Sequence, residues 1–288
     1  MRITATVAAL TLLATVLGAC TALDVVNSLV PADTYTVTVN LEYGSHSREK
    51  LDVYRPRPLS GARDGYPIVV FFHGGTWTRG ERSDYKFIGE ALAARGIVAI
   101  VASYRLYPQV RYPDFLIDCA RAVAWAAREA PRYGGDTRRL YVMGHSSGAY
   151  NAAMLALDPR WLSTAGLAPS ALAGWIGLAG PYDFLPTTDV DAQLVFHHPD
   201  YPADSQPIDH VSGTAPRSFL GVAVDDDIVN PERNTKRLAE KLNAAGVPVT
   251  LRIYAKASHY TLIGAFARPL RRLEPVLSDV VAFVRDPA

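Results

Sequence analysis

Short, continuous hydrophobic runs separated by amphipathic stretches dominate the chain from residue 67 onward. Apolar runs of this length are typical of strands buried on both faces of a parallel sheet. The runs cover residues 68–72, 97–102, 140–143, 175–179, 219–224 and 249–253. Helical patterns occupy about 84–95, 114–130, 147–157, 231–245 and 270–284. This alternation predicts a doubly wound α/β sheet with right-handed crossovers.

Two further strands are expected before this core. Residues 35–43 alternate between polar and apolar positions, and residues 50–54 follow after a Gly/Ser turn. This pattern predicts an antiparallel hairpin, which brings the mostly parallel sheet to about eight strands. The stretch 184–216 is rich in Pro, Asp and His and shows little periodicity. We expect it to form a loop or short lid over the C-terminal edge of the sheet, where open α/β sheets bind ligands.

The composition fits one large globular domain. The chain has 288 residues, of which 49% are hydrophobic, and its 29 Lys and Arg residues nearly balance its 28 Asp and Glu residues. No net field therefore favours nucleic acid, and we expect no such partner. Of the two cysteines, Cys119 falls within an apolar helical pattern and is expected in the core. The sequence does not indicate an oligomeric state.

The N-terminus departs from this globular pattern. Residues 7–17 are almost continuously apolar and lead into Leu17-Gly-Ala-Cys20, a run too short to span a bilayer comfortably. The ending resembles the lipobox of bacterial lipoproteins, which implies cleavage before Cys20 and acylation of its thiol. An ordinary export signal is the alternative. We therefore expect a signal peptide over 1–20, a polar tether over 21–33 and a catalytic domain over 34–288, exported to the cell envelope and anchored by lipid.

A Gly-x-Ser-x-Gly motif lies between the run 140–143 and the helical pattern 147–157. In this context the serine, Ser146, is expected on a sharp turn with strained dihedral angles, where side chains two residues away would collide. Gly144 and Gly148 remove those collisions. The following helix directs its N-terminus toward the serine and favours negative charge there. The motif predicts Ser146 as a nucleophile.

The strand 68–72 runs directly into His-Gly-Gly-Thr-Trp at residues 73–77. This motif resembles the His-Gly-Gly-x-Trp loop of carboxylesterases and kynurenine formamidases in the α/β-hydrolase superfamily. The resemblance extends over about 48–284 and implies the α/β-hydrolase fold. Its departure is the threonine, a position where other members carry different residues, and we expect little consequence because the position acts through its backbone.

The resemblance also implies roles for individual residues. The backbone amides of Gly75, Thr76 and Ser147 would form an oxyanion hole, because glycines let the main chain approach a reacting oxygen closely. Trp77 and Tyr182 are expected to bind substrate, although a buried tryptophan often serves packing alone.

The remaining triad members are expected after the last strands, in the order serine, acid, histidine. Of the seven histidines only His259 follows the last strand pattern, so it is the predicted base. The acid is sought after the run 219–224, where three aspartates occur in succession. Asp227 is preferred because related hydrolases show an acid followed by x-Val-x-Pro, with Asp226 next and Asp225 last. Asp183 is the alternative after the preceding strand.

These predictions describe a serine hydrolase that cleaves a small carboxylic ester through an acyl-enzyme. The sequence contains no His-Glu-x-x-His, no Cys-x-x-Cys and no dinucleotide glycine fingerprint, so neither metal nor organic cofactor is expected. Two alternatives stay open: an arylformamidase acting on amides with the same triad, and a binding module without catalysis.

Overall fold

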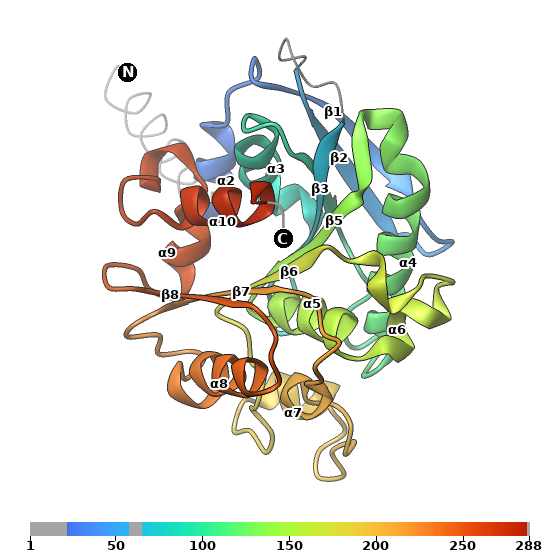
Figure 1. Ribbon diagram of the computed structural model, residues 1–288, viewed down its shortest axis with the longest axis vertical. Helices are drawn as coiled ribbons and strands as arrows, with labels where there is room; N and C mark the ends of the chain where they lie inside the picture. The colour runs from blue at the N-terminus through green and yellow to red at the C-terminus, as the bar shows by residue number, and fades with distance from the viewer. Residues whose placement is uncertain (1–21, 58–64, 287–288) are drawn as a thin grey trace, which may run out of the picture.

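The hydrophobic runs pair into one eight-stranded sheet in the order β1-β2-β4-β3-β5-β6-β7-β8 (Figure 1). The structure is a computed structural model that describes residues 22–57 and 65–286. β1 pairs with β2 and β2 with β4 antiparallel, whereas β3 to β8 are parallel. The strands are Tyr35–Glu42 (β1), Lys50–Pro56 (β2), Tyr66–Phe72 (β3), Val98–Ala102 (β4), Gly135–His145 (β5), Gly174–Leu178 (β6), Ser218–Ala223 (β7) and Val249–Tyr254 (β8). This is the predicted α/β-hydrolase fold.

Helices cover both faces of the sheet (Figure 1). One apolar layer is built with α4 (Asp114–Glu129), α5 (Ser147–Leu157), α6 (Pro159–Thr164) and α8 (Arg237–Ala244). The other is built with α3 (Lys86–Ala93), α9 (His259–Gly264) and α10 (Val276–Arg285). Within β3, Val70 and Phe72 belong to the first layer and Val69 and Phe71 to the second. Because both faces are covered, alternate positions are all apolar, which explains the continuous hydrophobic runs.

The helix expected over 231–245 begins in an unusual conformation. Its first turn, Glu232–Lys236, is π-helical, and α8 continues from it. The Arg233 amide donates to Asn230 Oδ1 at 2.9 Å, so Asn230 caps the helix from the side-chain oxygen. Single π-helical turns often occur beside functional sites, and this one borders the pocket described below.

The segment expected to be a tether instead contains a docked helix, α2 (Ala22–Ser28). Leu23, Val26 and Val30 pack against the core layer of α3 and α10. The Asn27 side chain donates from Nδ2 to the carbonyls of Ser83 and Asp84, at 3.2 and 2.9 Å, and its Oδ1 accepts from the Phe87 amide at 3.2 Å. The apolar spacing of three and four residues was a helical signal within this short stretch. Cys20 and the proposed signal peptide lie outside the described residues.

None of the helices in the described part of the chain combines the length and the hydropathy required to cross a bilayer.

Candidate active site

Ser146 lies at the junction of β5 and α5 with φ 55° and ψ −124°. A non-glycine residue with positive φ is uncommon and strained, and such residues cluster at functional sites. The Ser146 amide donates to the Leu178 carbonyl at 2.9 Å, which ties the turn to β6. The strand-turn-helix context required for a nucleophile at Ser146 is therefore present.

The two glycines of the motif are required by close backbone contacts. A Cβ at Gly144 would lie 2.0 Å from the Gly148 carbonyl oxygen, and a Cβ at Gly148 would lie 2.0 Å from the Phe72 carbonyl oxygen. Neither contact is possible for a larger residue without moving main chain. The second contact also shows that the turn packs directly on the end of β3.

The loop after β3 lies against this turn. A Cβ at Gly74 would approach the Ser146 Cβ to 3.1 Å, so the glycine permits the two segments to touch. Gly75, Thr76 and Trp77 have φ values of 118°, 51° and 58°. Glycine adopts such φ values readily, whereas Thr76 and Trp77 are strained, and strained residues of this kind cluster at functional sites.

The amides of Gly75, Thr76 and Ser147 donate no hydrogen bond within residues 22–57 and 65–286. Thr76 and Ser147 line the same pocket as Ser146. Ser147 is also the first residue of α5, where the amides of the first turn have no partner within the helix. This arrangement offers donors and a positive helix end to an anion beside Ser146.

His73, at the start of this loop, is buried and contacts the loop backbone. Its imidazole stacks on Tyr104 with ring centroids 4.5 Å apart, and its Nδ1 donates to the Gly74 carbonyl at 2.8 Å. Burial lowers the pKa of His73 to about 3, so the ring is neutral. His73 therefore orders the loop.

His259 lies at the start of α9 and is bonded to Asp226, on the turn after β7. The His259 Nδ1 lies 2.8 Å from Asp226 Oδ2 and 3.1 Å from Oδ1, and both side chains are buried. Asp226 Oδ1 also accepts from the amides of Ile228 and Val229, at 3.0 and 2.8 Å. Burial raises the pKa of Asp226, but the hydrogen bonds from His259 and these amides outweigh it and leave the carboxyl below its usual pKa.

The preference for Asp227 is corrected by this geometry. Asp227 and Asp225 are exposed, whereas Asp226 is 7% exposed and faces the imidazole. The two amides that follow Asp226 fold the chain into a turn around its carboxylate, and this turn directs its neighbours to solvent. The other candidate, Asp183, is paired with Arg237 and lies 3.8 Å from Arg233, so it is structural.

A pocket of about 360 Å³ opens beside Ser146. Its walls combine apolar side chains with polar ones, most of which come from residues 187–189 and from the π-helical turn. The lining residues are Thr76, Trp77, Ser146, Ser147, Pro181, Phe184, Pro186, Thr187, Thr188, Asp189, Ala192, Ile228, Val229, Asn230, Arg233 and Asn234. Trp77 is thus at the predicted place, and its Nε1 donates to Asn151 Oδ1 at 3.0 Å.

Tyr182 is not at the predicted place. Its side chain is fully buried, packs edge-on against Trp175, and is absent from the pocket lining. Its neighbours Pro181 and Phe184 line the pocket instead. The prediction chose the correct loop, the one after β6, but the wrong residue on it. On an irregular loop no regular spacing in the sequence indicates which side chains point into a pocket.

The segment 184–216, predicted to be a loop or short lid, borders the pocket with its first part, residues 184–192. It contains α7 (Val190–Val195) and a short 3₁₀ turn, Pro207–His210. Residues Phe184 to Ala192 contribute six lining side chains. Phe184 and Phe196 pack on Trp77, with ring centroids 6.0 and 4.9 Å away. The lid is therefore held by aromatic contacts on its inner side.

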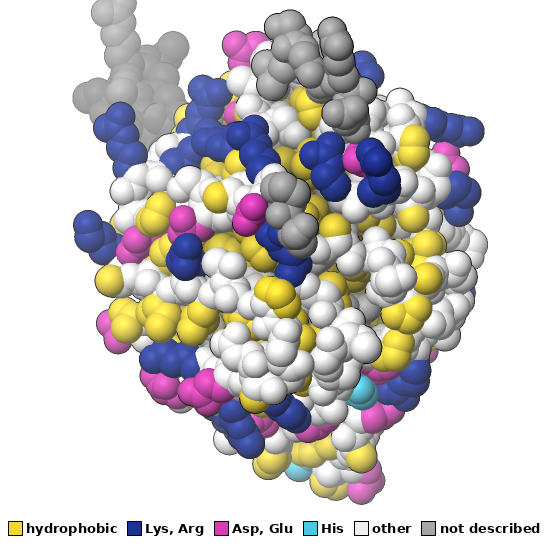
Figure 2. All heavy atoms as spheres, in the orientation of Figure 1, with side chains coloured by type: hydrophobic (Ala, Val, Ile, Leu, Met, Phe, Trp, Pro, Cys, Tyr) yellow, Lys and Arg dark blue, Asp and Glu magenta, His cyan; other side chains and the backbone are white. Residues whose placement is uncertain are grey.

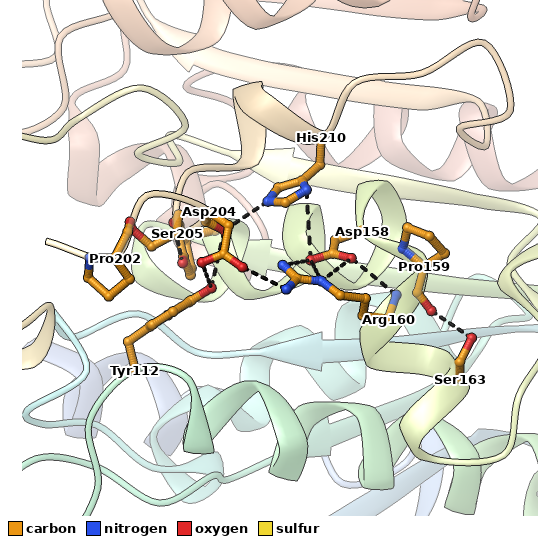
Figure 3. A network of polar contacts seen from close by, with 10 residues as sticks. Tyr112, Asp158, Pro159, Arg160, Ser163, Pro202, Asp204, Ser205 and His210 are labelled. Atoms are coloured by element: carbon orange, nitrogen blue, oxygen red, sulfur yellow. Dashed lines mark hydrogen bonds and ion pairs between the residues drawn. The ribbon is translucent and has the colours of Figure 1, made fainter.

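A polar network holds the far end of the lid (Figure 3). Asp158 caps α6 and accepts from the Arg160 guanidinium at 2.6 Å, and the same guanidinium donates to Asp204 Oδ2 at 2.6 Å. The His210 Nε2 donates to the Asp204 carbonyl at 2.8 Å, and the Tyr112 hydroxyl donates to the same carbonyl at 3.1 Å. Asp158 is 2% exposed, so this anchor is partly shielded from solvent.

No group of three or more His, Cys, Asp or Glu side chains in the described ranges is arranged to hold a metal ion.

Comparison with known proteins identifies the family. A family model named BD-FAE matches residues 51–242, about two thirds of the chain, so the protein belongs to the BD-FAE family. Among curated proteins it is similar to a probable isoprenylcysteine alpha-carbonyl methylesterase of Arabidopsis thaliana, with 25% identity over 85% of this chain and 55% of that protein. It is also similar to esterase LipC of Mycobacterium tuberculosis, with 28% identity over 70% of this chain and 54% of that protein. The chain thus spans about half the length of these two relatives.

Solved structures show the same fold. A truncated carbohydrate esterase from gut microbiota superposes with a TM-score of 0.74 and 18% identity, over 88% of this chain and 97% of that one. A hyperthermophilic esterase from Pyrobaculum calidifontis superposes with a TM-score of 0.72 and 20% identity, over 91% and 88%. Each protein named in these comparisons carries the name of an esterase.

Proposed function

We propose that this protein is a serine hydrolase that cleaves small carboxylic esters through an acyl-enzyme on Ser146. The single observation that carries the proposal is the buried Asp226–His259 pair beside a strained serine turn with free amides. The family assignment and the esterase names of the relatives support the ester class.

In the proposed mechanism the pair of His259 and Asp226 activates the serine. Nδ1 of His259 faces Asp226, which leaves Nε2 to accept the Ser146 proton as Oγ attacks the acyl carbon. Asp226 holds the tautomer with the proton on Nδ1 and stabilises the imidazolium that forms. The negative oxygen of the tetrahedral intermediate is bound by the amides of Gly75, Thr76 and Ser147.

His259 then gives its proton to the departing alcohol, and the acyl group stays on Ser146. A water loses a proton to the same imidazole, attacks the acyl carbon, and releases the carboxylic acid with the serine restored. The pocket of about 360 Å³ lies at the small end of ligand sites, which favours short acyl groups.

The test compares wild type with Ser146→Ala on p-nitrophenyl esters of increasing acyl length. We expect turnover of short esters by wild type, a loss of at least about 10³-fold in kcat for Ser146→Ala, and a fluorophosphonate adduct mapped to Ser146. Equal turnover by both proteins would contradict the mechanism. An N-formylated arylamine in the same panel tests the amide alternative, which gains if it is turned over faster than the esters. A folded wild type that neither reacts with the probe nor hydrolyses any substrate would favour a binding module.

We also propose that the protein is exported and carries lipid on Cys20. The proposal rests on the apolar run 7–17 and on Leu17-Gly-Ala-Cys20. We expect membrane-extracted protein to yield an acylated N-terminal peptide that begins at Cys20, and Cys20→Ser to lose this modification. An unmodified Cys20 in mature protein would favour the ordinary export signal.

A further inference from the structure

One buried histidine of the site has no part in the mechanism above. His145 immediately precedes Ser146, at the last position of β5, and is 4% exposed. Its Nε2 lies 2.9 Å from the His259 carbonyl oxygen, and its ring centroid lies 4.8 Å from that of His259. Because a carbonyl only accepts, Nε2 must carry the proton of the neutral ring.

The other ring nitrogen of His145 has no partner. Nδ1 is buried and makes no hydrogen bond within the described residues. An unpaired buried polar atom is unfavourable, and an apolar side chain at this position would avoid it. The one hydrogen bond that the side chain does form is therefore the feature that a histidine adds here.

This hydrogen bond connects the two segments that must cooperate. One end is on the residue before Ser146, and the other is on the main chain of His259. Asp226 fixes the His259 side chain through Nδ1. His259 is thus held at its ring by Asp226 and at its main-chain carbonyl by His145.

We infer that His145 is a positioning residue, which holds His259 in register with Ser146 through its Nε2–H bond to the His259 carbonyl. The inference rests on the proposed function, because it assigns His145 a role in the reaction of that site. A neutral ring suits this role, since a second cation would oppose the imidazolium on His259. Burial and the nearby His259 ring lower the pKa of His145 to about 3, despite the opposing influence of the hydrogen bond to the His259 carbonyl and of Asp226.

The sharpest test compares two substitutions of similar length. His145→Gln keeps an N–H donor that can reach the carbonyl, whereas His145→Met has none, and both lose the ring. We expect His145→Met to lower kcat about tenfold or more with KM within about twofold, since misplacement affects the transition state more than binding. His145→Gln should recover most of the lost kcat. Equal kcat values for the two variants, at equal thermal stability, would overturn the inference.

A measurement on the wild-type protein tests the proposed hydrogen bond even where a variant does not fold. Nitrogen NMR of ¹⁵N-histidine-labelled full-length protein reports which ring nitrogen carries the proton. We expect His145 to be protonated on Nε2 and neutral at pH 7; protonation on Nδ1 or on both nitrogens would overturn the inference. Failure of the proposed function would appear separately, as wild-type turnover by Ser146→Ala, and would leave the NMR result unchanged.

Discussion

At the scale of single residues, the carboxylate that orients His259 is selected by a local turn. Asp226 receives two amide hydrogen bonds from the residues that follow it, and these bonds direct it inward between two exposed aspartates. A buried carboxylate with three donors stays ionised and cannot be replaced by either neighbour without rebuilding the turn.

Substitution of Asp226 and of the adjacent Asp227 should therefore have very different effects on kcat. We expect Asp226→Asn to lower kcat by about 10³- to 10⁴-fold, because the amide cannot hold the productive tautomer of His259. Asp227→Asn should stay within about threefold of wild type, because the side chain is exposed. Steady-state kinetics on a short ester checks both. A larger loss of kcat in Asp227→Asn than in Asp226→Asn would show that Asp227, and not Asp226, serves as the acid.

The buried neutral histidines should make stability depend on pH. The pKa values of His73 and His145 are lowered to about 3, whereas in the unfolded chain both titrate near 6.5. Below pH 6.5 the unfolded chain therefore binds more protons than the native protein, and the free energy of unfolding falls as the pH falls toward 3. At pH 5 each histidine should reduce it by about 2 kcal/mol relative to pH 7.5.

Urea unfolding at pH 7.5 and pH 5.0 measures this difference. The Asp226 carboxyl does not interfere, since its pKa lies below the window in both states. His73→Gln provides the control, because it should remove about half of the pH dependence. A free energy of unfolding that is constant across this range would show that the rings accept protons without unfolding.

At the scale of elements, the lid is anchored at two ends by different interactions. Phe184 and Phe196 pack on Trp77 near Ser146, whereas Asp204 and His210 join the network around Asp158 and Arg160. The inner contacts shape the pocket, and the outer network fixes where the segment returns to the body of the protein.

Removal of Arg160 tests the outer anchor. Arg160→Ala leaves the carboxylate of Asp158 buried without its cation, and we expect the free energy of unfolding to fall by about 2 kcal/mol. We also expect faster proteolysis within 196–216. Arg128→Ala is the matched control, because the Arg128 side chain is largely exposed and Glu129 keeps its pair with Arg132, so the loss should stay below about 0.5 kcal/mol. Equal effects of the two substitutions would show that the network does not hold the lid.

At the scale of the whole molecule, burial explains what the sequence could predict. The β3 to β7 runs are covered on both faces, so they stand out as continuous apolar stretches. Ser146 and His259 could be selected as candidates because each follows a predicted strand. Figure 2 shows the contrast on one face, where charged side chains spread over the surface between apolar patches. Asp226 was ranked only second among the three aspartates, and Tyr182 was wrongly placed in the pocket, because local turns rather than a sequence period set the direction of these side chains.

The α2 helix escaped prediction for a different reason. Only Leu23 and Val26 of the helix and Val30 just after it pack against the core, and all three are partly buried. A helix of this length depends on tertiary contacts, and here the side chain of Asn27 supplies three hydrogen bonds. Helices this short do not persist alone in water, so the helical spacing of its apolar residues was a weak signal in so short a stretch.

The contacts of Asn27 should be measurable. Asn27→Ala removes three hydrogen bonds to the loop and helix that follow β3, and we expect a loss of about 1–2 kcal/mol in the free energy of unfolding. Amide hydrogen exchange over residues 22–28 should accelerate together. Ser28→Ala, on the exposed side of the same helix, should change neither. Unaltered exchange in Asn27→Ala would mean that α2 is held by its apolar side chains alone.

If Cys20 carries lipid, as proposed above, the docking of α2 limits how far the protein could extend from a membrane. A fully extended linker over residues 21–33 would reach about 45 Å and let the pocket sample substrates well above the bilayer. Because α2 begins at Ala22, only Thr21 separates it from Cys20. With lipid on Cys20, the domain would lie directly against the lipid headgroups. Its substrates would then be esters held in the lipid layer or reaching the membrane surface by diffusion.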